Sequence, residues 1–288
     1  MTSWCTANVA HGHAMSDQTT ITRGSPMLAV YPAYGDRMPR QHDHDAGGAP
    51  DLLAAKAAVR NEVWAVMKAA KAARFPGAVG RIPNFVGAEA AAERLRGTTA
   101  WTGATTVKAN PDAPQWPVRQ RALEDGKTVF MAVPRLAEAD PFFLLDPAHL
   151  RDSPRAASSI KGASNSARRV AVEALAPVDL VVAGSVAVSP NGARLGKGGG
   201  FSDLEFAIAR QAGLIGDNTI VVSTVHELQV VDNGRIPVTA HDVPLDLIVT
   251  PERVIRCRRK KRPVEIRWDE LTDDKISAIP ILQQLRRR

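Results

Sequence analysis

The chain has 288 residues, 44% of them hydrophobic, so it is long enough to bury the core of one sizeable α/β domain. Most of the net charge of +7 comes from residues 251–288, which hold 12 Lys and Arg against 6 Asp and Glu. The two cysteines, Cys5 and Cys257, exclude a disulfide framework or a cysteine-based zinc site and are typical of a reducing compartment. No apolar run is long enough to span a membrane, so we expect a cytoplasmic protein.

Composition divides the chain into three segments. Residues 1–50 mix Gly, Pro, His and Thr without periodicity, so we expect a disordered N-terminal arm. Residues 51–255 contain the recognisable strands and helices, and residues 256–288 form a basic C-terminal tail with a short helix. The cations of 256–262 could follow nucleic-acid phosphates, but no aromatic side chain lies among them to stack on bases. A solvated tail or a contact with an acidic surface is therefore favoured over a nucleic-acid partner.

The hydrophobic pattern predicts alternating helices and strands. We expect helices at 51–70, 87–95, 117–124, 167–175 and after 201, strands at 105–107, 128–133, 180–186, 219–225 and 245–250, and an irregular connection at 137–165. Such alternation predicts a three-layer α/β fold whose mostly parallel sheet has helices on both faces. Ligands of these sheets bind beyond the carboxyl ends of the strands, where the segment around residue 196 and Asp242 fall.

The most informative segment is Arg194–Ser202, which holds four glycines and two cations between a strand and a helix. Glycines let bare backbone approach a ligand, and the N–H groups at the start of a helix bind anions. The lysine is not followed by Ser or Thr, so the segment is not a Walker A loop, and it lacks the spacing of a dinucleotide fingerprint. Ser202 and Glu205 also have the spacing of a capping box, which would explain them structurally.

The helix at 51–70 carries a second pair of cations. Lys56 and Arg60 are four residues apart, so they lie on the same face of the helix and repel each other mildly. A solvated pair is the common reason for such spacing, whereas a nearby phosphate would make the pair favourable. Asp203 and Asp242 are carboxylates of the kind that Mg²⁺ takes, although Asp203 would also complement the helix dipole.

Together these residues resemble the 5-formyltetrahydrofolate cyclo-ligase family. The run Arg194-Leu-Gly-Lys-Gly-Gly-Gly-Phe-Ser-Asp203 is similar to the family signature R-L-G-x-G-x-G-[YF]-Y-D. Lys56 with Arg60, Val133-Pro-Arg135, and Asp242 with Asp246 resemble its other motifs. Residues 81–85, 184–188 and 241–251 are closest to the branch of methenyltetrahydrofolate synthetase domain-containing proteins.

The resemblance implies a NagB/RpiA-like, Rossmann-like fold and an ATP- and Mg²⁺-dependent ligase. Such an enzyme converts the small molecule 5-formyltetrahydrofolate to 5,10-methenyltetrahydrofolate through a phosphorylated formyl intermediate. By resemblance Arg194 and Lys197 are catalytic, and Asp203 and Asp242 hold the metal. The nucleotide would be bound by Lys56, Arg60, Arg194, Leu195, Gly196, Lys197, Gly198, Gly199, Gly200, Phe201 and Ser202.

Two departures from the family pattern keep a second function open. Ser202 replaces the second aromatic of the signature, and we find no acidic residue after an early strand of the kind that binds the pterin, because residues 76–103 occupy that region with other chemistry. The alternative is a paralogue that does not cyclise folate. It would use the same loop to bind a nucleotide, RNA or another heterocycle, for example in thiamine metabolism.

Overall fold

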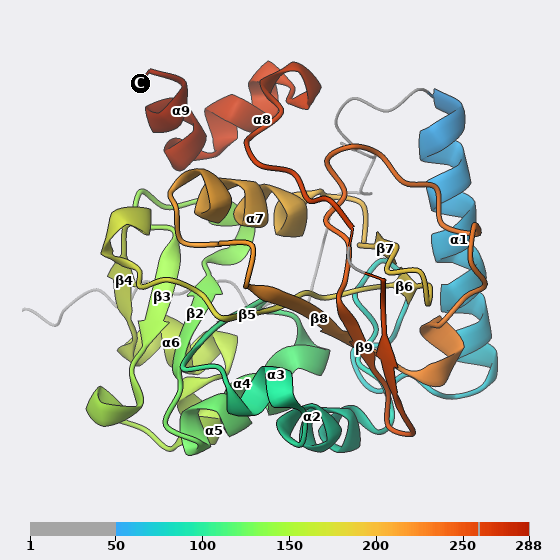
Figure 1. The fold of residues 1–288 in the computed structure, drawn as a ribbon, viewed down its shortest axis with the longest axis horizontal. Coiled ribbons are helices and arrows are strands. Elements are labelled where there is room, and N and C mark those ends of the chain that lie inside the picture. The colour runs from blue at the N-terminus through green and yellow to red at the C-terminus, as the bar shows by residue number, and fades with distance from the viewer. Residues whose placement is uncertain (1–49, 259, 288) are drawn as a thin grey trace, which may run out of the picture. The chain divides into compact units, whose positions relative to one another are not determined.

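The computed structural model describes residues 50–258 and 260–287, and an eight-stranded sheet in the order β10-β9-β8-β5-β1-β2-β3-β4 forms the centre of this region (Figure 1). The bounds of its strands are β1 Thr106–Ala109, β2 Thr128–Ala132, β3 Phe142–Leu145, β4 Arg168–Val170, β5 Leu180–Val182, β8 Ile220–Thr224, β9 Leu247–Val249 and β10 Val254–Arg256. A separate hairpin joins β6 (Ala187–Val188) to β7 (Arg194–Leu195). The predicted arm at 1–50 lies outside the described residues, apart from Pro50, where the first helix begins.

Parallel pairing dominates the middle of the sheet. The five adjacent strands β9, β8, β5, β1 and β2 all pair in parallel, whereas β10 at one edge and β3 and β4 at the other are antiparallel. The mostly parallel sheet predicted from the sequence is therefore confirmed. Because neighbouring parallel strands end on the same side, the residues that follow β1 and β5 are brought together.

Helices cover both faces of this sheet. Their bounds are α1 Pro50–Ala69, α2 Ala88–Arg96, α3 Thr99–Thr102, α4 Trp116–Glu124, α5 Pro154–Ala157, α6 Ile160–Ser166, α7 Phe201–Gln211, α8 Asp273–Ala278 and α9 Pro280–Arg286. In Figure 1, α7 lies on one face of the sheet, below α8 and α9. The other face is covered by α2, α3 and α4, and α1 lies beside the β6–β7 hairpin. No helix within the described ranges 50–258 and 260–287 has the length and apolar character needed to cross a membrane.

The central strands bury their side chains on both faces. In β2, Phe130 and Ala132 belong to the apolar core that contains α7, while Val129 and Met131 belong to the core that contains α2 and α4. A strand covered by helices on both sides needs apolar residues at successive positions rather than at every second one. This requirement explains the uninterrupted apolar run that predicted the strand.

The region from 137 to 175 differs from the sequence-based expectation. The connection expected to be irregular contains β3, α5 and α6, and β4 lies where a helix was expected at 167–175. The prolines bound these short elements instead of preventing them. Pro141 directly precedes β3, and Pro154 starts α5, where its missing N–H would have no intrahelical partner.

The C-terminal segment is more ordered than the predicted tail, although the cations Arg256, Arg258, Lys260 and Lys261 of the basic run are exposed, as a solvated run would be. Arg256 ends β10, and Arg262 forms an ion pair with Asp246 and donates to the carbonyl of Thr219 at 2.7 Å. The segment beyond them buries four residues of α8, α9 and their junction in the core that contains α7, namely Ile276, Ile279, Ile281 and Leu282. Apolar residues at helical spacing decide the position of the segment, because its charged side chains can remain at the surface.

Asp179 links the start of β5 to the start of β1. Its carboxylate accepts hydrogen bonds from the N–H and the hydroxyl of Thr105, both at 2.8 Å, and from the N–H and the hydroxyl of Thr106, both at 3.0 Å. Burial raises the pKa of Asp179, but these hydrogen bonds outweigh burial, so the pKa lies below its ordinary value. The ionised carboxylate therefore stabilises the junction of the two central strands.

We predict that Asp179→Asn lowers the free energy of unfolding at pH 7 by about 1–3 kcal/mol, because the N–H and hydroxyl donors of Thr105 and Thr106 lose an ionised acceptor. Because the pKa of Asp179 is lowered in the folded state, its ionised carboxylate stabilises the fold above the unfolded pKa of about 3.9. This stabilisation is lost as the pH falls through the folded-state pKa. The difference between wild type and variant should therefore shrink below about pH 4. Urea unfolding at pH 7 and pH 3 measures this difference, and an equal difference at both pH values would contradict the prediction.

Candidate functional site

The glycine-rich loop runs from the end of β7 into α7. Gly198 has a φ of 116° and Gly200 a φ of 63°, both in the left-handed region that L side chains rarely adopt. Gly200 is the N-cap of α7 and provides no side-chain cap, so the first N–H groups of the helix point into the loop. These glycines give the loop the backbone conformation that an anion cradle needs.

A buried ion pair closes the base of this loop. Arg194 in β7 is only 4% exposed; its Nη2 pairs with Asp203 in the first turn of α7, and its Nη1 donates to the carbonyl of Gly184 at 3.0 Å. Asp203 also accepts from the N–H of Val243 at 3.0 Å. Burial lowers the pKa of Arg194 and raises that of Asp203, but the pairing outweighs burial, so the pKa of Arg194 is raised and that of Asp203 is lowered.

The cations of α1 meet the loop as the sequence suggests. Arg60 donates from Nε to the carbonyl of Gly196 at 2.9 Å, and its guanidinium would lie 3.6–3.8 Å from a Cβ at Gly198. Lys56, one helical turn earlier, pairs with Asp242 at 2.9 Å. Both side chains are almost fully buried, so they are fixed parts of the site and not a solvated pair.

The two predicted metal residues are each half of an ion pair. Asp242 accepts from Lys56 and also from the N–H and hydroxyl of Thr239 at 2.7 and 2.9 Å, while Asp203 pairs with Arg194. Within the part of the chain that the structure describes, no group of three or more His, Cys, Asp or Glu side chains could hold a metal. Any Mg²⁺ here would take one or two of these carboxylates and complete its shell with phosphates and water.

The expected capping box at 202–205 is not formed. The hydroxyl of Ser202 donates to Asn110 at 3.1 Å, whereas Glu205 turns into the protein and forms a buried ion pair with Lys108. Asn110 also donates to Glu205 at 3.0 Å. Burial raises the pKa of Glu205 above its ordinary value even though Lys108 opposes this rise. A buried lysine thus draws the glutamate away from the N-terminus of α7.

The remaining predicted loop residues lie at different depths. Leu195 is buried in the apolar cluster under α1, so its side chain supports the loop from below. Lys197 is 43% exposed and extends towards Asp112, with 3.5 Å between Nζ and Oδ1. The partly buried ring of Phe201 lies under the ammonium of Lys275, 5.4 Å from its centroid. Of the predicted loop cations, only Lys197 reaches outwards.

The structure also reveals an acidic residue that sequence reasoning missed. Asp112 follows β1 at its carboxyl end, and a Cβ at Gly184 would lie 2.6 Å from its Oδ2, so glycine at the end of β5 permits this approach. The amide of Gln115 is fully buried nearby, and within the described residues neither of its polar atoms has a hydrogen-bond partner. The run Asn110-Pro-Asp112, directly after a strand, was the available sequence signal.

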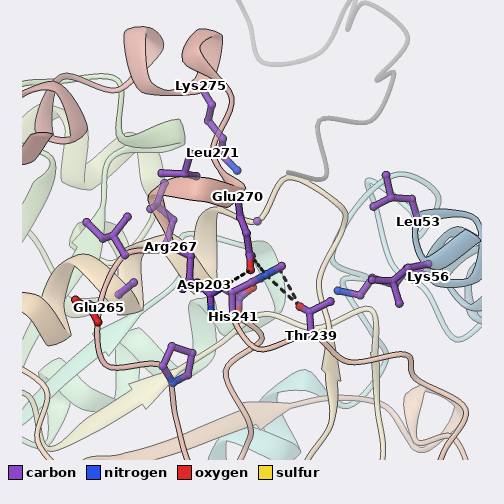
Figure 2. Close-up of a pocket in the computed structure, with 16 residues that line it drawn as sticks. Leu53, Lys56, Asp203, Thr239, His241, Glu265, Arg267, Glu270, Leu271 and Lys275 are labelled. Atoms are coloured by element: carbon purple, nitrogen blue, oxygen red, sulfur yellow. Dashed lines mark hydrogen bonds and ion pairs between the residues drawn. The ribbon is translucent and has the colours of Figure 1, made fainter. Parts of the chain in front are cut away.

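The two histidines near the loop have structural contacts. His226 accepts from the N–H of Leu228 and lies edge-on to Phe85, as a structural histidine does. His241 pairs with Glu270, which lies in the C-terminal segment, and Figure 2 shows both beside Asp203 and Thr239. His241 also lies 3.1–3.2 Å from the hydroxyl of Thr239, but that hydroxyl donates to Asp242 at 2.9 Å, so the contact has a structural explanation.

Comparison with known proteins places this site in a family. The model of the 5-formyltetrahydrofolate cyclo-ligase family matches residues 51–251. The methenyltetrahydrofolate synthase domain-containing protein of Bos taurus is 39% identical over 242 residues, which are 82% of this chain and 63% of that protein. Its counterpart in Mus musculus is 40% identical over 238 residues, which are 81% of this chain and 63% of that protein. The chain thus spans about 63% of the length of these curated relatives.

A solved structure also aligns with this fold. The NMR structure of 5,10-methenyltetrahydrofolate synthetase from Aquifex aeolicus covers 75% of this chain and 99% of its own length, at 18% identity and a TM-score of 0.46. The matched range 51–251 contains α1, the glycine-rich loop and Asp242, which carry the resemblance in the sequence. The mammalian relatives bear the name of the branch to which the sequence was closest. The chain belongs to the 5-formyltetrahydrofolate cyclo-ligase family.

Proposed function

We propose that the chain is an ATP- and Mg²⁺-dependent cyclo-ligase that converts 5-formyltetrahydrofolate to 5,10-methenyltetrahydrofolate. The observation that carries the proposal is the meeting of three cations, Lys56, Arg60 and Lys197, around a glycine loop at the N-terminus of α7. Backbone N–H groups, a helix N-terminus and cations together favour a polyphosphate.

The proposed location of the protein is the cytoplasm, because the free thiol of Cys257 suits a reducing compartment.

The reaction needs phosphate transfer to a poor leaving group. The formyl oxygen attacks the γ-phosphorus of ATP and ADP leaves, which turns that oxygen into part of a phosphate ester. N10 of the folate then bonds to the formyl carbon, phosphate leaves, and N10 loses its proton. These steps need positioning, charge neutralisation and exclusion of water more than a covalent protein group.

The residues divide between the phosphate and the folate. Lys56 and Arg60 bind the triphosphate from α1, and Lys197 neutralises the transferring phosphoryl group from the loop. Asp112 lies 3.5 Å from Lys197, so it faces the same reacting region from the end of β1. We assign Asp112 to the N–H donors of the pterin, the role that an acidic residue after an early strand has in the family.

The carboxylates near the loop have the donor chemistry of a Mg²⁺ site. Asp203 and Asp242 provide hard oxygen ligands, and both are already ionised partners of cations, Arg194 and Lys56. A bound Mg²⁺ would shield the charge of the phosphates, with Asp242 and Asp203 as its protein ligands. Arg194 is buried behind Asp203, so we assign it to positioning the loop rather than to direct contact with the γ-phosphate.

The decisive experiment is an assay of the purified chain with 5-formyltetrahydrofolate and MgATP. The methenyl product absorbs in the near ultraviolet, and its formation should saturate with both substrates and stop when ATP is left out. Turnover at background with nucleotide binding intact would instead identify a binding protein that does not cyclise folate. Absence of nucleotide binding would overturn the phosphate assignment itself.

We predict that Lys197→Ala lowers kcat/KM for ATP about 100-fold, because a cation that neutralises transferring charge in a preorganised site is lost. The free energy of unfolding should change by less than about 0.5 kcal/mol, since the side chain is 43% exposed. Lys68→Ala is the matched control, because Lys68 is an exposed lysine in the last turn of α1. Equal losses of activity and stability in Lys197→Ala would contradict the assignment.

We also predict that Asp203→Ala destabilises the fold by about 3 kcal/mol or more, because it leaves the Arg194 guanidinium buried without its carboxylate. The double variant Arg194→Met with Asp203→Leu should regain most of this stability, since apolar side chains of similar size replace the pair, yet remain inactive because the loop loses its anchor. Chemical unfolding and turnover of the three proteins test this. If Asp203→Ala is as stable as the wild type and differs only in its response to Mg²⁺, the predicted structural role of Asp203 is wrong and the residue acts only as a metal ligand.

A further inference from the structure

The C-terminal segment 263–287 is a fixed part of the protein although it lies beyond the matched family range of 51–251. Ile266 and four residues of α8, α9 and their junction are buried in the same apolar core as Leu204 and Ile208 of α7. Burial of this many apolar side chains holds the segment against α7. Its inner surface therefore has a defined position relative to the glycine-rich loop, which leads into that helix.

This segment forms one wall of a pocket beside the loop (Figure 2). The opposite walls come from α1, from the first turns of α7 and from residues 239 and 241. Apolar side chains line much of the pocket, including Leu53, Leu204, Ile266 and Leu271. Its charged groups are three cations and three carboxylates, namely Lys56, Arg267, Lys275, Asp203, Glu265 and Glu270. An apolar cleft with a few convergent polar groups is the usual form of a small-molecule site.

Lys275 brings a further cation to the loop. Its Nζ donates to the carbonyl of Gly199 at 2.9 Å and would lie 3.1 Å from a Cβ at Gly200. In Figure 2 the side chain extends from α8 down towards the pocket. Lys275 and Arg60 thus contact carbonyl oxygens of the same loop, at Gly199 and Gly196, from two different helices.

These two contacts change the electrostatic character of the loop. Carbonyl oxygens in an anion-binding loop repel a phosphate, and a cation bonded to each of them offsets that repulsion. Lysine also carries three donors, so Lys275 can keep its bond to Gly199 and donate to a phosphate oxygen as well. The contact between the His241 ring and the Glu270 carboxylate ties the same segment to the loop of Asp242.

We propose that the segment 263–287 completes the nucleotide site: Lys275 binds the phosphates of the nucleotide, and the pocket between this segment, α1 and α7 takes its nucleoside. The proposal rests on the proposed function, since it assigns the same loop to ATP. It adds a phosphate-binding residue from outside the part of the chain that matches the family, and a nucleoside pocket to which the C-terminal segment contributes one wall.

Isothermal titration of the full chain with ATP, without folate, tests this. Lys275→Gln should raise the Kd for ATP about tenfold and the Kd for adenosine less than twofold, since adenosine has no phosphate for the lysine to bind. Lys275→Arg should keep affinity for ATP within about threefold of wild type, because it retains the charge. Arg286→Gln is the matched control: Arg286 lies in α9 of the same segment, is exposed and pairs with Asp273, so its loss should leave both Kd values within twofold.

The outcomes separate this proposal from the cyclo-ligase assignment. An unchanged Kd for ATP in Lys275→Gln would overturn it even if the wild type turns over 5-formyltetrahydrofolate. A tenfold loss of ATP affinity in Lys275→Gln would support the proposal even if the wild type never forms the methenyl product. That second result would overturn the cyclo-ligase assignment alone. Equal losses for ATP, adenosine and thermal stability would show that Lys275 only holds the fold and would overturn the proposal, as would a wild type that does not bind ATP.

Discussion

The buried ion pair between Arg194 and Asp203 is the interaction on which the site depends. It joins β7 to the first turn of α7, and its two further hydrogen bonds reach the end of β5 at Gly184 and the backbone at Val243. The pair and its two hydrogen bonds therefore fix four separate parts of the chain relative to one another. Buried pairs of this kind add little net stability, because desolvation offsets most of their attraction. The pair instead fixes both ends of the glycine loop, so that the loop has one defined conformation between β7 and α7.

Fixing the base of the loop allows its other groups to be exposed to a ligand. Arg60 and Lys275 donate to the loop carbonyls of Gly196 and Gly199, and Gly198 and Gly200 have the left-handed conformation. The cations come from α1, from the loop and from α8, which are far apart in the sequence. Without a polyphosphate between them, so many positive groups in one place would repel one another, and the structure offsets this with Asp112, Asp203 and Asp242.

Local features of the site could be read from the sequence, whereas features that depend on strand order could not. The glycine loop and the Lys56 with Arg60 pair are set by residues a few positions apart, so both were predicted. Asp112 was missed because its place opposite Lys197 follows from β1 lying next to β5 in the sheet. The capping box at Ser202 failed because Lys108, some hundred residues away, draws Glu205 into the core.

The same distinction applies to the C-terminal segment and to the antiparallel edge. The positive run at 256–262 dominated the composition and suggested a tail, although Ile276, Ile279 and Leu282 follow it at helical spacing and are buried. β3 and β4 are short and lie among prolines, so they have little local signal and exist because β2 offers a free edge for pairing. Pairing partners, unlike periodicity, are decided by the whole sheet.

The side of the site that would face the heterocycle is built from hydrogen bonds where the family signature has a second aromatic ring. Ser202 donates to Asn110, and the same Asn110 oxygen accepts from the N–H of Gly184, so the residue after Phe201 belongs to a polar network at the ends of β1 and β5. The buried amide of Gln115 and the carboxylate of Asp112 lie beside this network. Stacking accepts many flat rings, but a site of directed donors and acceptors rejects a ring whose polar groups leave them unpaired. Under the proposed function, the phosphate end of the site would bind the nucleotide and the Asn110 network would select the heterocycle that meets it.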